Sequence, residues 1–79
     1  MILFSPHAED EMQKSCISKE EVEDCLEHGE LVIRQYVKGE SRYGKELQLK
    51  DKKIIVIYTF KEEETRVVTC YPVKRKKWR

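Results

Sequence analysis

The sequence has few cysteines and few glycines, and each shortage argues against a class of protein. The three cysteines, Cys16, Cys25 and Cys70, are odd in number and far apart, without the Cys and His spacing of a zinc site. We expect them to be reduced, which favours a cytoplasmic location. The three glycines form no phosphate-binding loop. We therefore expect neither a metal nor a cofactor.

Long apolar runs are also missing. The longest run, residues 54–60, is interrupted by Thr59, and the N-terminal run ends at Phe4. A membrane-spanning helix needs about 20 apolar residues, and the apolar part of a signal peptide needs about 7 to 15. We therefore expect no membrane segment and no such export signal.

The length of 79 residues allows one domain, residues 1–79. Charged residues make up 39% of the chain, equal to the hydrophobic share of 39%. The apolar residues are clustered in patterns rather than evenly diluted, which indicates a folded chain. A core of this size supplies only about 3 to 5 kcal/mol, so a partner chain is a natural expectation.

The formal net charge of +1 conceals two opposed halves. Residues 1–30 contain nine acidic residues and two lysines, whereas residues 31–79 contain six acidic residues and fourteen lysines and arginines. The basic tail, residues 74–79, reads Lys-Arg-Lys-Lys-Trp-Arg. Cations beside an aromatic ring can contact phosphates and stack on bases, which predicts a nucleic-acid partner. The alternative is an ordinary solvated terminus.

Two helices are predicted near the N-terminus. Ser5 can cap a helix over residues 6–14, because Pro6 suits its first position. Ser18 and Glu21 form a capping-box pattern at the start of a second helix. Gly29 stands where a left-handed residue would end that helix.

Alternating apolar residues then predict strands over residues 31–37, 43–50, 53–60 and 66–71, with Pro72 ending the last pairing. Short connections favour an antiparallel meander. The predicted class is α+β, with two N-terminal helices packed on an antiparallel β-meander of about four strands. An extra short N-terminal strand is compatible with this arrangement.

Several residues could support metal-free cleavage of RNA, which needs a general base, an acid and cations for the phosphate. His7, at the positive end of the first helix, suits a neutral base. The sheet half offers Arg42, Tyr43, Lys45, Arg66, Thr69 and Tyr71. The alternative interpretation is an exposed histidine without a role and ordinary surface chemistry on the strands.

The sequence resembles a small prokaryotic family of unknown function. The resemblance covers essentially the whole chain and is carried by Ser5-x-His7-Ala8, Met12, Ile17-Ser18-x-x-Glu21-Val22, Leu26, Gly29, Tyr43-Gly44, Val56-x-Tyr58-Thr59 and Arg66-Val67-Val68-Thr69-x-Tyr71-Pro72. That family is similar to the plasmid-toxin superfamily that includes the RelE and BrnT ribonuclease toxins. The resemblance implies a compact RelE-like α/β fold with an antiparallel sheet, an RNA substrate, free or on the ribosome, and a protein antitoxin.

The resemblance also suggests roles for individual residues. His7 corresponds to a base, with Arg66 and Tyr71 as phosphate or acid partners. The expected substrate-binding residues are Arg42, Tyr43, Lys45, Lys74, Arg75 and Lys77. This chain departs from the family pattern at Glu11, Ser15 and Cys16, where arginine, arginine and glycine are usual.

We therefore expect an RNA-binding, toxin-type domain that acts as a metal-independent endoribonuclease, or a non-enzymatic module that binds nucleic acid or an acidic protein. The two missing arginines favour the second alternative. A third interpretation is a homodimer in which the acidic half of one copy meets the basic half of another.

Overall fold

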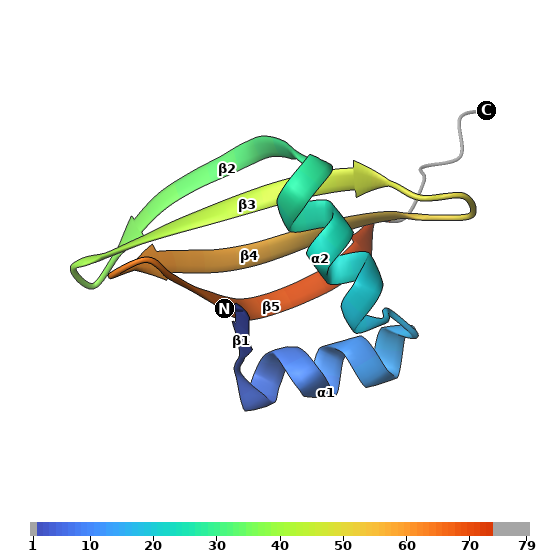
Figure 1. Ribbon diagram of the computed structural model, residues 1–79, viewed down its shortest axis with the longest axis horizontal. Coiled ribbons are helices and arrows are strands. Elements are labelled where there is room, and N and C mark those ends of the chain that lie inside the picture. The colour runs from blue at the N-terminus through green and yellow to red at the C-terminus, as the bar shows by residue number, and fades with distance from the viewer. Residues whose placement is uncertain (1, 74–79) are drawn as a thin grey trace.

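The computed structural model describes residues 2–73 and contains two helices and five strands. In chain order, the elements are β1 (Ile2–Phe4), α1 (Pro6–Ser15), α2 (Lys19–His28), β2 (Glu30–Val37), β3 (Glu40–Gln48), β4 (Lys53–Lys61) and β5 (Glu64–Val73). Strands account for most of these residues. Both helices lie on the same side of the sheet (Figure 1).

The sheet is mixed, with strand order β1-β5-β4-β3-β2. β1 runs parallel to β5, while the other neighbours are antiparallel. The predicted RelE-like fold, two N-terminal helices on an antiparallel meander of about four strands, is therefore wrong. The short N-terminal strand that we allowed for is present, but it pairs in parallel with β5 and makes the sheet mixed and five-stranded, which short hairpin connections cannot produce.

Local capping explains where α1 begins and ends. The Ser5 hydroxyl accepts a hydrogen bond from the Ala8 backbone N–H at 3.0 Å, and it donates one to the Val68 carbonyl at 2.9 Å. The helix therefore starts where the chain leaves the edge of β5. It ends at Cys16, whose φ of 56° lies in the left-handed region that favours glycine.

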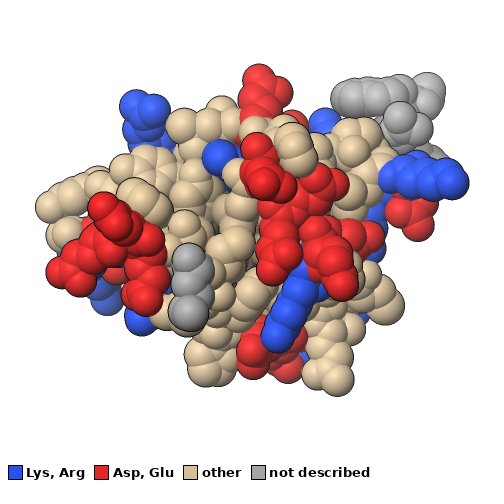
Figure 2. All heavy atoms as spheres, viewed as in Figure 1, with Lys and Arg blue, Asp and Glu red and all other residues tan. Residues whose placement is uncertain are grey.

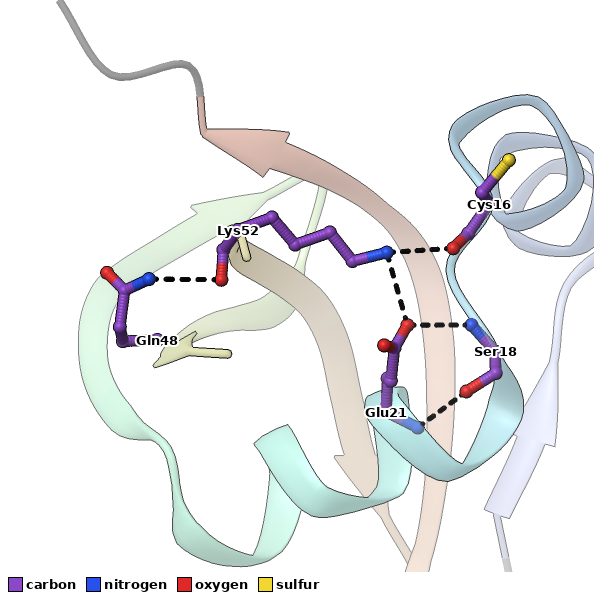
Figure 3. A network of polar contacts seen from close by, with 5 residues as sticks. All are labelled: Cys16, Ser18, Glu21, Gln48 and Lys52. Atoms are coloured by element: carbon purple, nitrogen blue, oxygen red, sulfur yellow. Dashed lines mark hydrogen bonds and ion pairs between the residues drawn. The ribbon is translucent and has the colours of Figure 1, made fainter. Parts of the chain in front are cut away.

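The predicted capping box at the start of α2 is confirmed. The Ser18 hydroxyl accepts from the Glu21 N–H at 3.1 Å, and the Glu21 carboxylate accepts from the Ser18 N–H at 3.0 Å. Lys52, from the β3–β4 turn, donates to the Cys16 carbonyl at 2.8 Å and lies 3.4 Å from the same carboxylate (Figure 3). This network ties the turn to the junction of the two helices.

Gly29 ends α2 in a different way from the prediction. Its φ of −74° is not left-handed. A Cβ added there would lie 2.9 Å from the Glu46 carbonyl oxygen and even closer to the Cys25 carbonyl oxygen. Glycine is therefore needed because the Cys25 carbonyl of α2 and the Glu46 carbonyl of β3 both crowd this position, and not because of its backbone angle.

The core lies between the helices and the sheet. Its members are Ala8, Met12, Ile17, Val22, Cys25, Ile54, Val56, Val67 and Cys70. We call this side of the sheet the helix-covered face, marked by Ile54, Val56 and Val67. The other side, marked by Ile33, Gly44 and Ile57, is the helix-free face. Gly44 is tightly enclosed there, because a Cβ would lie 2.8 Å from the Ile33 Cβ and 2.9 Å from the Ile57 Cδ1.

Two β-bulges change which side chains share a face. In β2 the register shifts between Leu31 and Ile33, so Leu31 pairs with Lys45 on the helix-covered face while Ile33 faces the other way. The simple alternation predicted for residues 31–37 is therefore wrong at this point. In β5 the register shifts so that Tyr58 pairs with Val67 and Ile57 with Thr69, which leaves Val68 as the extra residue.

The last strand continues past the predicted stop, because Pro72 pairs with Ile54. β1 pairs with β5 only as far as Val67, so the edge of β5 away from β4 is unpaired at Pro72. A proline without an N–H is tolerated on such an edge.

The β2–β3 hairpin and the β4–β5 hairpin both turn tightly. Lys38 and Gly39 both have positive φ, as do Glu62 and Glu63, at 54° and 64°. Two-residue turns of this kind match the twist of the strands, although glycine or asparagine is favoured in them.

Within residues 2–73, no helix is long and apolar enough to cross a membrane.

Candidate functional site

The three predicted catalytic residues are spread over the fold. His7 is exposed at the second position of α1, and Arg66 and Tyr71 are exposed on β5. Arg66 pairs with Thr59 and Tyr71 with Ile55, four positions apart along β4. This spacing corresponds to about 13 Å between backbones. No hydrogen bond or ion pair among residues 2–73 joins the three.

The predicted substrate-binding residues divide into three groups. Arg42 lies on the helix-free face, whereas Tyr43 and Lys45 lie on the helix-covered face, because successive strand residues alternate. Lys74, Arg75 and Lys77 lie outside the described residues. A single ligand on one face of the sheet therefore contacts only part of the predicted set.

Arg42, Thr59 and Arg66 form a cross-strand row on the helix-free face, which we call the arginine row. Thr59 of β4 pairs with Arg66 of β5, and the pairing of Tyr43 with Tyr58 puts Arg42 of β3 beside Thr59 on its other side. Neighbouring strands are about 4.8 Å apart, so the two arginine backbones are about 10 Å apart. Two long guanidinium side chains can converge on one anion across that distance.

The middle and one end of the arginine row have distinctive surroundings. Thr59 is only 7% exposed, although no helix covers it. The Nε atom of Arg42 is buried and makes no hydrogen bond within the described part of the chain. Its carboxylate neighbour, Glu40 Oε1, is 3.6 Å away, which is within ion-pair range but beyond a hydrogen bond. One arginine of the row is therefore partly neutralised by an ion pair within the chain.

The bulge at Val68 gives Arg66 its place in the row. Without the extra residue, alternation from Tyr71 and Thr69 would put Arg66 on the helix-covered face with Cys70. The register shift returns it to the face that carries Thr59. Sequence reasoning named Arg42 and Arg66 but missed Thr59, whose signal was a threonine inside the most apolar strand.

The helix-covered face carries a second candidate site, where α2 leaves the sheet uncovered. It is an open hollow of about 420 Å³, which we call the aromatic hollow. Its lining residues are Ile2, Leu26, Leu31, Tyr43, Lys45, Tyr58, Phe60 and Thr65. The two tyrosine ring centroids are 5.7 Å apart, with the planes tilted by 37°.

Lys45 and Tyr58 give the aromatic hollow its polar character. The Lys45 ammonium group donates to the Leu26 carbonyl at 2.6 Å and lies 5.9 Å from the Tyr58 ring centroid. Burial raises the pKa of Tyr58, with a smaller contribution from Tyr43. The Tyr58 phenol therefore stays protonated around neutral pH. Sequence reasoning identified Tyr43 and Lys45 but assigned no role to Tyr58.

The cysteines do not provide a nucleophile on the core side. Cys25 and Cys70 are fully buried, and burial raises the pKa of each thiol to about 11. Thiolates are therefore scarce at neutral pH. Among residues 2–73, no three His, Cys, Asp or Glu side chains are grouped closely enough to hold a metal ion.

A further hollow of about 400 Å³ lies at the β3–β4 turn, lined by Gln48, Lys50, Asp51, Lys52, Lys53 and Val73. Two of its lysines are held in ion pairs, Lys52 with Glu21 at 3.4 Å and Lys53 with Glu46 at 3.6 Å. These contacts give the lysines a structural role in anchoring the turn.

A family model described as a domain of unknown function (DUF4258) matches residues 4–72. The matched segment contains the arginine row and most of the aromatic hollow. No curated protein matches the chain.

Proposed function

The chain belongs to the DUF4258 family, and we propose that it is an RNA-binding domain of the RelE and BrnT toxin type that holds the RNA backbone on the arginine row. The observation that carries this proposal is the row itself, with two arginines flanking a threonine on the helix-free face. The toxin relationship rests on the sequence motifs, and it adds a protein antitoxin as the expected partner.

The chemistry of the row suits a phosphate. A guanidinium group presents several N–H donors in a fixed fork that matches phosphate oxygens, and a threonine hydroxyl can donate a further hydrogen bond. Phosphate contacts of this kind supply most of the affinity in sequence-independent binding. A phosphate would reach Arg42 through the 35% of its side chain that is exposed, and not through its buried Nε.

The charge of the two faces supports the same orientation. The helix side carries the acidic surface of α2, and Figure 2 shows these carboxylates gathered in the middle of that view. Exposed Glu20, Glu23 and Glu27 contribute to it. Phosphates would be repelled there, so we propose that the RNA lies on the opposite, helix-free face.

Binding comes first in this proposal and cleavage second. Metal-independent cleavage requires His7 as the base, with Arg66 and Tyr71 as partners. The separation of about 13 Å between the two β5 residues argues against their joint action on one phosphate. Glu11 and Ser15, at positions where the family usually has arginine, also favour binding without turnover.

The proposal is tested by titrating a labelled single-stranded RNA with the full chain over a range of salt concentrations. Arg42→Lys and Arg66→Lys keep the charge but lose the forked geometry, and we expect each to weaken binding several-fold. In Arg66→Ala the slope of log K against log salt should fall by about 0.7, as expected for one lost phosphate contact to a single strand.

Arg34→Ala is the matched control. Arg34 is an exposed arginine of β2 that pairs with Tyr43, away from the row, and its loss removes the same charge. Equal weakening by Arg34→Ala and Arg66→Ala would contradict a specific role for the row.

Cleavage is measured separately, on total RNA and on ribosomes with EDTA present. Turnover that His7→Ala abolishes while RNA binding persists would identify a nuclease. Intact RNA together with normal binding would leave the non-enzymatic alternative.

A further inference from the structure

The aromatic hollow has an unusually exposed apolar rim for such a small domain. Phe60 is 59% exposed and Leu31 is 41% exposed, and both line the hollow beside Tyr43 and Tyr58. Exposed apolar side chains that gather around a hollow are typical of binding surfaces. The arginine row lies on the opposite face, so the RNA proposal does not account for this site.

Acidic residues surround the hollow on two sides. Glu23 and Glu27 of α2 line a smaller recess that shares Ile2 and Leu26 with it. On the other side, residues 62–64 add three glutamates directly after Phe60 and Lys61. Figure 2 shows red side chains over α2 and again over the β4–β5 hairpin. An apolar centre with an acidic rim fits a basic segment that carries an aromatic residue.

We infer that the aromatic hollow receives residues 74–79 from a second copy of this chain. That segment, Lys-Arg-Lys-Lys-Trp-Arg, has five cations and the only tryptophan of the sequence. The Trp78 indole would stack against the tyrosines, while neighbouring cations would face Glu23 and Glu27. Lys45, the one cation among the lining residues, is already hydrogen-bonded to the Leu26 carbonyl.

The chain's own tail is badly placed for the same contact. Tyr58 pairs with Val67, which precedes Val73 by six residues along β5, or about 20 Å. Trp78 follows Val73 by five residues, which span at most about 17 Å, so the indole comes near Tyr58 only if the tail runs fully extended along the sheet. In addition, α2 packs on β3 and β4 between these two ends of the sheet (Figure 1). Two copies can instead exchange tails reciprocally, each filling the hollow of the other.

The single tryptophan makes the inference directly measurable. We would record the emission of Trp78 and its quenching by iodide in the full chain over a wide range of protein concentrations, with light scattering to give the mass. We expect a blue shift and loss of quenching as concentration rises, together with a dimer. Added salt should reverse both changes, because the contact depends on opposite charges.

Variants then locate the contact. Phe60→Ser should abolish the blue shift, and Glu27→Lys should weaken the association about tenfold through repulsion of the tail. Val32→Ser is the matched control, because Val32 is 45% exposed on β2 and does not line the hollow. It should leave the association unchanged.

Three results would overturn the inference. A blue shift that does not depend on concentration would indicate the chain's own tail, and solvent-exposed emission at every concentration would exclude docking. A concentration-dependent shift that survives Phe60→Ser would move the contact elsewhere. Arg66→Lys separates the two proposals, since it should weaken RNA binding without affecting the association.

Discussion

The two faces of the sheet differ in how their residues are buried. On the helix-covered face, Ile54, Val56 and Val67 are completely buried beneath α1 and α2. On the helix-free face the side chains of Ile57 and Thr59 are 9% and 7% exposed and are shielded without a helix above them. The core therefore depends on one face, which leaves the other free to carry arginines.

The largest expected effect tests whether stability depends on the helix-covered face. Ile54→Ala should lower the free energy of unfolding by about 2 to 5 kcal/mol, because it removes a fully buried side chain and leaves a cavity. A domain of this size has about 3 to 5 kcal/mol in total, so the variant should be largely unfolded. Urea denaturation followed by circular dichroism measures the change.

Ile55→Ala is its matched comparison. Ile55 is the neighbouring residue on the same strand, but it is half-buried and faces away from the helices. Ile55→Ala should therefore lower the free energy of unfolding by clearly less than Ile54→Ala. Equal losses of stability in the two variants would show that the core does not depend mainly on the helix-covered face.

The second prediction concerns packing on the helix-free face. Gly44→Ala should lower the free energy of unfolding by about 1 to 3 kcal/mol, because the added Cβ would lie within 3 Å of both the Ile33 Cβ and the Ile57 Cδ1. The same substitution at Gly39 has open space around it and is opposed only by a φ of +78°. If thermal melting shows no loss for Gly44→Ala, this face is packed more loosely than we describe.

The smallest expected effect concerns the pKa of His28, which lies on the acidic surface of α2 on the helix side of the molecule. A hydrogen bond to Asp24, at 2.8 Å, raises the pKa of His28 on the exposed surface of α2. A pKa raised by folding favours the protonated form. The contribution to stability is therefore present below the ordinary pKa of 6.5 and is lost as the pH rises through the raised value. Titration of the His28 ring by NMR should show a lower pKa in Asp24→Asn, and an unchanged pKa would contradict the pairing.

Local signals in the sequence predicted local structure well. Ser5 with Pro6, and Ser18 with Glu21, marked both helix starts, because each capping interaction spans only three residues. Cys16 stands where the resemblance led us to expect glycine, and its φ of 56° is in the left-handed region that favours glycine.

Non-local geometry was beyond the same reasoning. The parallel pairing of β1 with β5 and the close approach of Gly29 to Glu46 join segments far apart in the chain. The bulge at Val68 had no recognisable signal, yet it decides on which face Arg66 lies. The arginine row therefore could not be predicted as a row, although both of its arginines were named as candidates.

The pairing of β1 with β5 also bears on the order in which the chain folds. The hydrogen bond from the Ser5 hydroxyl to the Val68 carbonyl joins residues 63 positions apart. During synthesis, β1 has no partner until the ribosome has made nearly all of the described chain. Closing so long a loop has an entropic cost before any contact forms, and such contacts slow folding. The hydrophobic strand Ile2–Phe4 is therefore made well before β5 and stays without its partner until that strand has been synthesised.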